Sequence, residues 1–95
     1  MTKMLKQAHI FIYGDVIGVG FRSWTKIQAK SFNIKGWVKN NYDKNCVEAL
    51  LQAEEDRLEP MISKLRQGPP VALVDEVETI WEKPTQIYED FVIRL

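Results

Sequence analysis

The chain has 95 residues, of which 45% are hydrophobic and 27% are charged. These proportions exclude a disordered chain, and the length is that of one compact domain covering residues 1–95. Thirteen basic and thirteen acidic side chains cancel, so no net field would draw the protein to nucleic acid or to an anionic membrane.

The first third of the chain predicts a strand, a loop and a helix. Residues 9–13 are His-Ile-Phe-Ile-Tyr, apolar at almost every position, which is typical of a strand covered on at least one face. Glycines at positions 14, 18 and 20 interrupt the next segment, and a helix is expected over residues 22–32. Trp24, Ile27 and Phe32 fall on one stripe of this helix, and Asn33 suits the left-handed conformation of a C-terminal cap.

The middle of the chain predicts a hairpin. Residues 34–41 and 46–53 are expected to be strands, and the Tyr-Asp-Lys-Asn sequence between them has turn chemistry. Apolar residues alternate along the second of these strands, so one face of it should be buried. The residues of that face are Val47, Ala49, Leu51 and Ala53.

A second helix is expected over residues 56–67. Asp56 and Glu59 have the spacing of a capping box at its start. Pro60 lies inside the pattern and removes a backbone hydrogen bond, so the helix should begin late or kink there. Its apolar stripe follows the i, i+3, i+4, i+7 spacing of a buried helix face and consists of Leu58, Met61, Ile62 and Leu65.

The last third completes a known order of elements. Gly68 and two prolines stop the second helix, and residues 74–82 and 91–95 look extended. The order β-α-β-β-α-β is the split βαβ pattern of ferredoxin-like folds. The predicted fold class is therefore α+β: a ferredoxin-like sandwich in which two helices cover one face of an antiparallel sheet, with a short extra strand at the C-terminus.

Several site types are excluded by residue counts. Cys46 is the only cysteine and His9 the only histidine, which rules out an internal disulfide and leaves too few ligands for a structural zinc site. No stretch approaches the roughly 20 apolar residues that cross a bilayer, and residues 1–7 carry two lysines with no apolar run behind them. We therefore expect a cytoplasmic protein without cofactor or metal, and a monomer, since nothing indicates an obligate oligomer.

The glycine-rich loop before the first helix is a candidate phosphate-binding site. Its backbone N–H groups could converge on an anion that the positive end of the helix also favours. Arg22, at or near the first helical turn, would add a planar and always charged fork for two phosphate oxygens. The spacing is neither a Walker nor a dinucleotide motif, and such turns are often purely structural. The candidate loop residues are Ile17, Gly18, Val19, Gly20, Phe21 and Arg22.

Two segments together carry a family resemblance. Gly-Val-Gly-Phe-Arg at residues 18–22 and Gly-Trp-Val-Lys-Asn at residues 36–40 resemble the two signature segments of the acylphosphatases, and the resemblance covers nearly the whole chain. It implies an antiparallel ferredoxin-like sheet and metal-free hydrolysis of an acyl phosphate to a carboxylate and inorganic phosphate. The family's phosphate-binding arginine matches Arg22, and its water-orienting asparagine matches Asn40. Inorganic phosphate would bind as product and inhibitor.

Two residues depart from the family's loop, and two other functions stay open. The family usually has an arginine or histidine and then a glutamine where this chain has Asp15 and Ile17, and a carboxylate near the phosphate would weaken binding. These departures support a non-catalytic anion-binding module of the same fold.

An RNA-binding domain is the other alternative function. The same element order also builds RNA recognition motifs, but residues 46–53 carry no stacking aromatic ring and no basic cluster.

Overall fold

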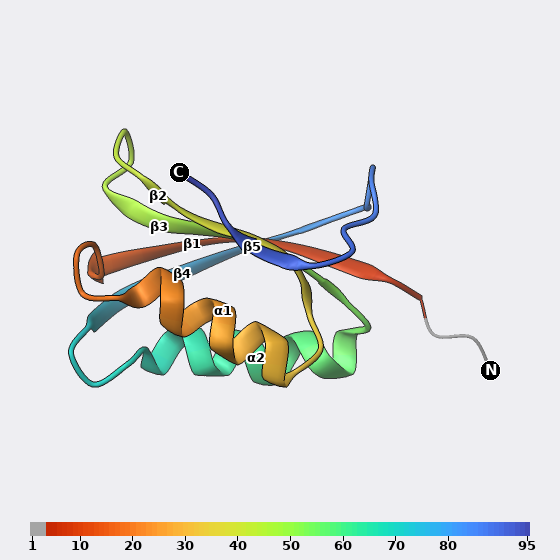
Figure 1. The fold of residues 1–95 in the computed structure, drawn as a ribbon, viewed down its shortest axis with the longest axis horizontal. Coiled ribbons are helices and arrows are strands. Elements are labelled where there is room, and N and C mark those ends of the chain that lie inside the picture. Colours follow the sequence, from red (N-terminus) through yellow and green to blue (C-terminus); the bar gives the residue numbers. More distant parts are fainter. Residues whose placement is uncertain (1–3) are drawn as a thin grey trace.

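The structure is a computed structural model that describes residues 4–95, so residues 1–3 of the predicted domain lie outside the described residues. Five strands and two helices follow one another in the expected order, with boundaries within a few residues of those predicted (Figure 1). The elements are β1 (Lys6–Asp15), α1 (Phe21–Ser31), β2 (Lys35–Asn41), β3 (Cys46–Ala53), α2 (Glu55–Gln67), β4 (Leu73–Glu82) and β5 (Phe91–Ile93).

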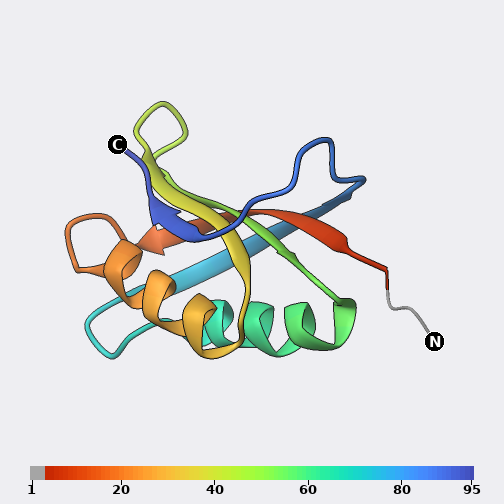
Figure 2. The ribbon, with the colours of Figure 1, turned by 45° about the vertical axis from the view of Figure 1, so that its right-hand side comes forward.

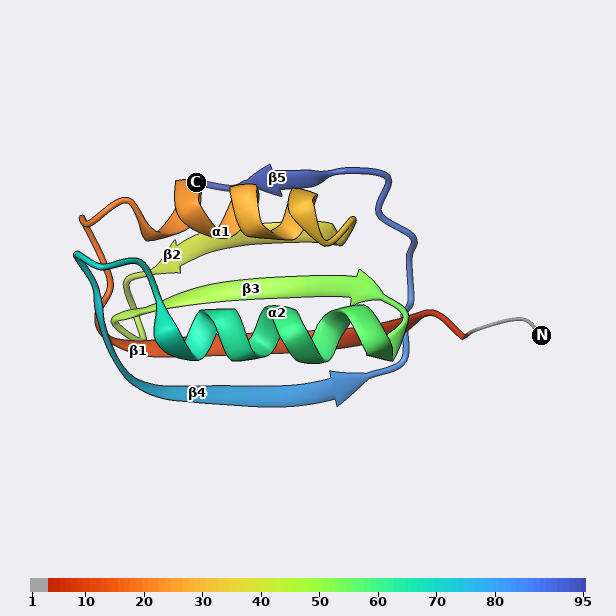
Figure 3. The ribbon, with the colours of Figure 1, turned by 90° about the horizontal axis from the view of Figure 1, so that it is seen from below.

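The strands form one sheet in the order β4-β1-β3-β2-β5. The pairs β1–β3, β1–β4 and β2–β3 are antiparallel, whereas β5 runs parallel to β2. The predicted antiparallel sheet is therefore confirmed for β1 to β4, and the predicted extra strand β5, whose direction was not predicted, makes the whole sheet mixed. The reason is that β4 ends where β2 begins, so a strand that follows β4 and joins the outer edge of β2 must run in the same direction as β2 (Figure 3).

Both helices cover the same face of the sheet, as predicted (Figures 1 and 2). Alternate residues of the central strands point into this layer and are fully buried, including Ile10 and Ile12 of β1 and Val47 and Leu51 of β3. The predicted stripe of α2 is confirmed, since all four of its residues are buried. Burying one such side chain contributes about 1.5–3 kcal/mol, so this layer holds the sheet and helices together.

The predicted stripe of α1 is only partly correct. Trp24 and Phe32 are half-buried against the core, but Ile27 is 65% exposed. The face that is fully buried carries Phe21 and the smaller residues Thr25 and Ala29. Small side chains such as Thr25 and Ala29 let a helix pack closely against its neighbours. A search for a stripe of large apolar residues does not detect a face of this kind.

The start of α2 also differs from its prediction. The N-cap is Glu54, with no side-chain capping hydrogen bond, so the Asp56–Glu59 capping box is wrong. The Glu54 carboxylate pairs instead with Arg57 one turn along. Pro60 lies within the helix, which begins before it and continues to Gln67, so the helix does not begin late.

Candidate functional site

The glycine-rich loop connects the end of β1 to the start of α1. Gly18 and Gly20 have φ of 81° and 78°, in the left-handed region that glycine adopts without strain. A Cβ atom at either position would meet no heavy atom within 4 Å. The glycines are therefore required by backbone conformation rather than by crowding, and the space in front of them is open.

The apolar side chains of the loop pack inward. Ile17 and Val19 are half-buried against the core, and Phe21 is buried with its ring 5.3 Å from that of Trp24. These side chains anchor the loop, so the loop can present only backbone groups to a ligand. Of the two residues that depart from the family's loop, Ile17 therefore lies on the side that packs against the core. Asp15, in contrast, is exposed at the end of β1.

The first turn of α1 has unfilled hydrogen-bonding capacity. The Trp24 N–H donates to the Gly20 carbonyl at 3.0 Å, which is the first bond of the helix. The three N–H groups before Trp24 have no partner within the helix. No side chain caps them and the turn contains no acidic residue. This end of α1 thus combines free donors with a positive helix terminus.

Arg22 is the second residue of α1 and is half-buried. Among residues 4–95 it makes no hydrogen bond or ion pair. A guanidinium without a protein partner keeps all five of its donors for a ligand. The loop backbone, the helix terminus and Arg22 therefore gather donors and positive charge at one end of the molecule.

Asn40 lies in β2 on the face that the helices cover. It is two residues beyond Val38, which belongs to the core, and it pairs with Val47, which is also in the core. Its side chain is half-buried, and its Nδ2 donates a hydrogen bond to the Tyr42 hydroxyl at 3.2 Å. The sequence pattern did not identify Tyr42, which was predicted only as part of a turn.

The topology brings Arg22 and Asn40 to the same end of the sheet. Strands β1 and β2 both pair antiparallel with β3, so they run in the same direction and their C-terminal ends lie together. The loop after β1 and the hairpin turn after β2 appear at the same side in Figures 1 and 3. Two segments that are separate in sequence thus share one end of the molecule.

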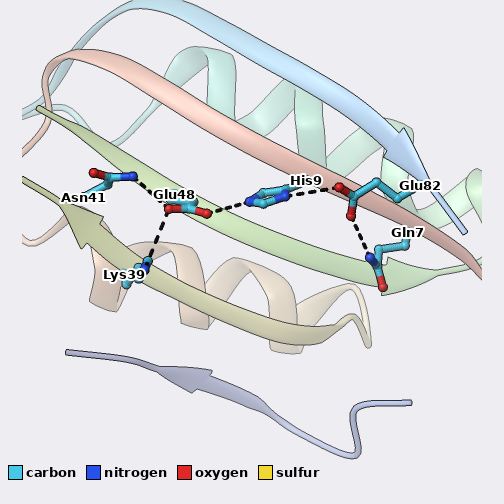
Figure 4. Close-up of polar contacts among 6 residues, drawn as sticks. All are labelled: Gln7, His9, Lys39, Asn41, Glu48 and Glu82. Carbon is cyan, nitrogen blue, oxygen red and sulfur yellow. Dashed lines mark hydrogen bonds and ion pairs between the residues drawn. The ribbon is translucent and has the colours of Figure 1, made fainter. Parts of the chain in front are cut away.

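The opposite face of the sheet carries a different set of polar groups. His9 Nε2 lies 2.6 Å from a Glu48 oxygen, and its Nδ1 lies 3.3 Å from Glu82 (Figure 4). Asn41 and Lys39 contact the other oxygen of Glu48 at 3.0 and 3.9 Å. These contacts cross-link β1, β2, β3 and β4 on the face without helices, so His9 does not join the candidate site.

Cys46 of β3 is not available as a reactive thiol, and Trp37 of β2 is not available as a stacking surface. Cys46 is fully buried, and this burial raises the pKa of its thiol, as expected for an unreactive side chain. Trp37 is 7% exposed, with the Arg94 guanidinium 4.7 Å from the ring centroid. The ring is thus already covered by a cation of the same chain and is not free to stack on a nucleic acid base.

A hollow of the surface lies far from Arg22 and Asn40. It is a half-open cavity of about 690 Å³ between the segment before β1, the start of α2 and the end of β4, at the opposite end of the sheet. None of the predicted site residues lines it.

Two other kinds of feature are absent from the described part of the chain. Within residues 4–95 there is no cluster of metal-ligating side chains and no helix long and apolar enough to cross a membrane.

Comparisons with known proteins address the family. The family model "Acylphosphatase" matches residues 8–93. Acylphosphatases from Pyrobaculum calidifontis and Thermococcus kodakarensis are 42% and 44% identical to this chain, over 94% and 82% of it and 81% and 85% of their own lengths. The crystal structure of acylphosphatase from Bacillus subtilis matches with a TM-score of 0.89 and 30% identity, over 97% of this chain and 100% of that one. The match to the family model and to these relatives shows that the chain belongs to the acylphosphatase family.

Proposed function

We propose that this protein hydrolyses acyl phosphates, with Arg22 and the loop of residues 17–22 binding the phosphate and Asn40 placing the attacking water. The observation that carries the proposal is the placement of Arg22 and Asn40. They come from the two segments that resemble the family's signatures, and both lie at the end of the molecule where α1 begins, with Asn40 on the face of the sheet that the helices cover. The relatives named acylphosphatase support the same reaction.

The chemistry needs few side chains. A water oxygen attacks phosphorus, the bond between phosphorus and the acyl oxygen breaks, and its electron pair leaves as the carboxylate. A carboxylate is stable without a proton near neutral pH, so no general acid is required. The phosphate oxygens accept the proton that the water releases. What is left is to neutralise phosphoryl charge and hold the water in line, which is the main task in phosphoryl transfer.

The residues divide this task between them. The N–H groups of the loop and of the first turn of α1, with the guanidinium of Arg22, would stabilise negative charge on the three outer phosphate oxygens. Asn40 would accept a hydrogen bond from the water on the same face. Ile17, Val19 and Phe21 would act through their packing and backbone rather than through their side chains.

The first test is the rate of phosphate release from benzoyl phosphate, measured in a chelating buffer. We expect turnover well above the buffer rate and inhibition by inorganic phosphate. Metal-dependent activity would contradict the proposed mechanism. The monomeric state and the cytoplasmic location expected from the sequence stay predictions.

A non-catalytic anion-binding module is the second candidate, and one observation favours it. Asp15 is exposed at the end of β1, directly before the loop, where the acylphosphatases usually have an arginine or a histidine, so the loop departs from the family's pattern beside the proposed site. The chain also aligns over 99% of its length with 12% of full-length HypF, whose structure is a phosphate- and nucleotide-bound form, at 28% identity and a TM-score of 0.89. Saturable phosphate binding with no turnover of benzoyl phosphate would select this function.

A further inference from the structure

The side chain of Tyr42 contacts Asn40 directly. Tyr42 follows β2 as the first residue of the turn at 42–45, and 74% of it is exposed. Its hydroxyl nevertheless accepts the hydrogen bond from Asn40 Nδ2 at 3.2 Å. An exposed tyrosine loses rotamer freedom in such a contact, so the contact fixes the Asn40 carboxamide at a conformational cost.

The contact determines which end of the carboxamide is free. A carboxamide has a nitrogen that only donates and an oxygen that only accepts hydrogen bonds. With Nδ2 bound to Tyr42, Oδ1 is left to accept a proton of a water. A water that donates to Oδ1 keeps both of its lone pairs for attack on phosphorus, whereas a water that accepted from Nδ2 would have one of its two lone pairs occupied.

The turn that carries Tyr42 is anchored through the other face of the sheet. The Lys44 N–H donates to Asn41 Oδ1 at 3.0 Å, and Asn41 Nδ2 donates to Glu48 at 3.0 Å. Glu48 is only 8% exposed and is also bound to His9 at 2.6 Å (Figure 4). Neighbouring strand residues point to opposite faces, so Asn41 holds the turn from one side while Tyr42 reaches Asn40.

We propose that Tyr42 is a positioning residue for the reaction: its hydroxyl holds the Asn40 carboxamide with Oδ1 toward the attacking water. This inference rests on the proposed hydrolase function. It assigns Tyr42 no contact with the substrate and no proton transfer. Loss of the Tyr42 hydroxyl is therefore expected to lower the rate of the chemical step and to leave phosphate binding unchanged.

The test compares Tyr42→Phe with Tyr88→Phe, which removes the same hydroxyl from the connection between β4 and β5, at the opposite end of the sheet. We expect kcat for benzoyl phosphate to fall about three- to tenfold in Tyr42→Phe, the effect of one lost hydrogen bond. KM and inhibition by phosphate should be unchanged, and Tyr88→Phe should match the parent. In an Asn40→Ala background, Tyr42→Phe should have no further effect on kcat.

Two outcomes would overturn the inference: an equal loss of kcat from Tyr42→Phe with and without Asn40, or a change confined to KM. A second measurement is independent of turnover. The side-chain amide signals of Asn40 in a proton–nitrogen correlation spectrum, identified by their absence in Asn40→Ala, should shift in Tyr42→Phe but not in Tyr88→Phe. Unshifted signals would reject the contact itself. A parent that releases no phosphate while these signals shift would reject the hydrolase function and, with it, the catalytic role of Tyr42, but not the contact.

Discussion

The two helices begin in opposite ways, although both present a positive terminus. The first turn of α2 carries two acidic residues, Glu55 and Asp56, and its N-cap is a third, Glu54. The first turn of α1 has no acidic residue, follows two glycines of positive φ and contains Arg22. Carboxylates near a helix N-terminus stabilise it by about 0.3–1 kcal/mol each. Helix α2 thus has its own anions at its N-terminus, whereas the first turn of α1, where we propose that the phosphate binds, has none.

Among variants that test this difference between the two helix termini, Arg22→Ala should have the largest effect on activity. Removing the only full positive charge proposed for the α1 terminus should lower kcat/KM for benzoyl phosphate by more than about a thousandfold and weaken inhibition by phosphate. Arg22→Lys should restore little, because an ammonium cannot grip two oxygens as a planar fork does. Arg66→Ala, at an exposed arginine in the last turn of α2, is the matched control and should behave as the parent. Near-parental turnover in Arg22→Ala would reject the assignment.

Asn40→Ala should separate water placement from anion binding. We expect kcat to fall about a hundred- to a thousandfold, as for other preorganised groups at such sites. Inhibition by phosphate should persist, since the loop and Arg22 are intact, and thermal unfolding should change little. Loss of phosphate inhibition together with turnover would place Asn40 in anion binding instead.

Making α1 resemble α2 should move stability and binding in opposite directions. Ser23 is exposed in the first turn of α1, and Ser23→Glu would supply the carboxylate that this turn lacks. The free energy of unfolding should rise by about 0.3–1 kcal/mol. Phosphate inhibition should weaken on the order of fivefold, because a fixed negative charge would compete for the same donors. Ser63→Glu on the exposed side of α2 is the control, and equal phosphate inhibition in both variants would refute the contrast.

The smallest effect should come from making α2 resemble α1. Glu55→Gln removes one anion from the first turn of α2 and should lower the free energy of unfolding by about 0.3–1 kcal/mol. Chemical denaturation would measure this change. Phosphate release should be unaffected, since this terminus is at the opposite end of the sheet from Arg22. A loss of activity in a stably folded variant would mean that the two ends are coupled.

Sequence reasoning predicted some parts of the fold better than others, for physical reasons. The stripe of α2 was predicted correctly because large apolar residues repeat at helical spacing, and β3 was predicted with its observed bounds. The buried face of α1 was missed because Thr25 and Ala29 give little hydrophobic signal. The parallel pairing of β5 was missed because strand direction depends on where the preceding strand ends, which no local pattern records.

The candidate site divides in the same way. Arg22 and Asn40 were found from two short motifs, and the structure brings them to one end of the molecule. Their roles stay predictions. Tyr42 could not be found, because its contact depends on the side chain of a turn residue folding back onto a strand two residues earlier. The sequence places the two residues close together but does not specify this contact.

The mixed sheet also determines when its strands can be completed during synthesis. Strand β1 pairs on one side with β3, but its other partner is β4, with Gln7 opposite Glu82. The outer partner of β2 is β5, with Gly36 opposite Phe91. Pairings this distant in sequence are slow to form, and unpaired edges invite association with other chains. A nascent chain that ends before β4 therefore exposes one edge of β1 and one edge of β2, and these edges are covered only when β4 and β5 have been made.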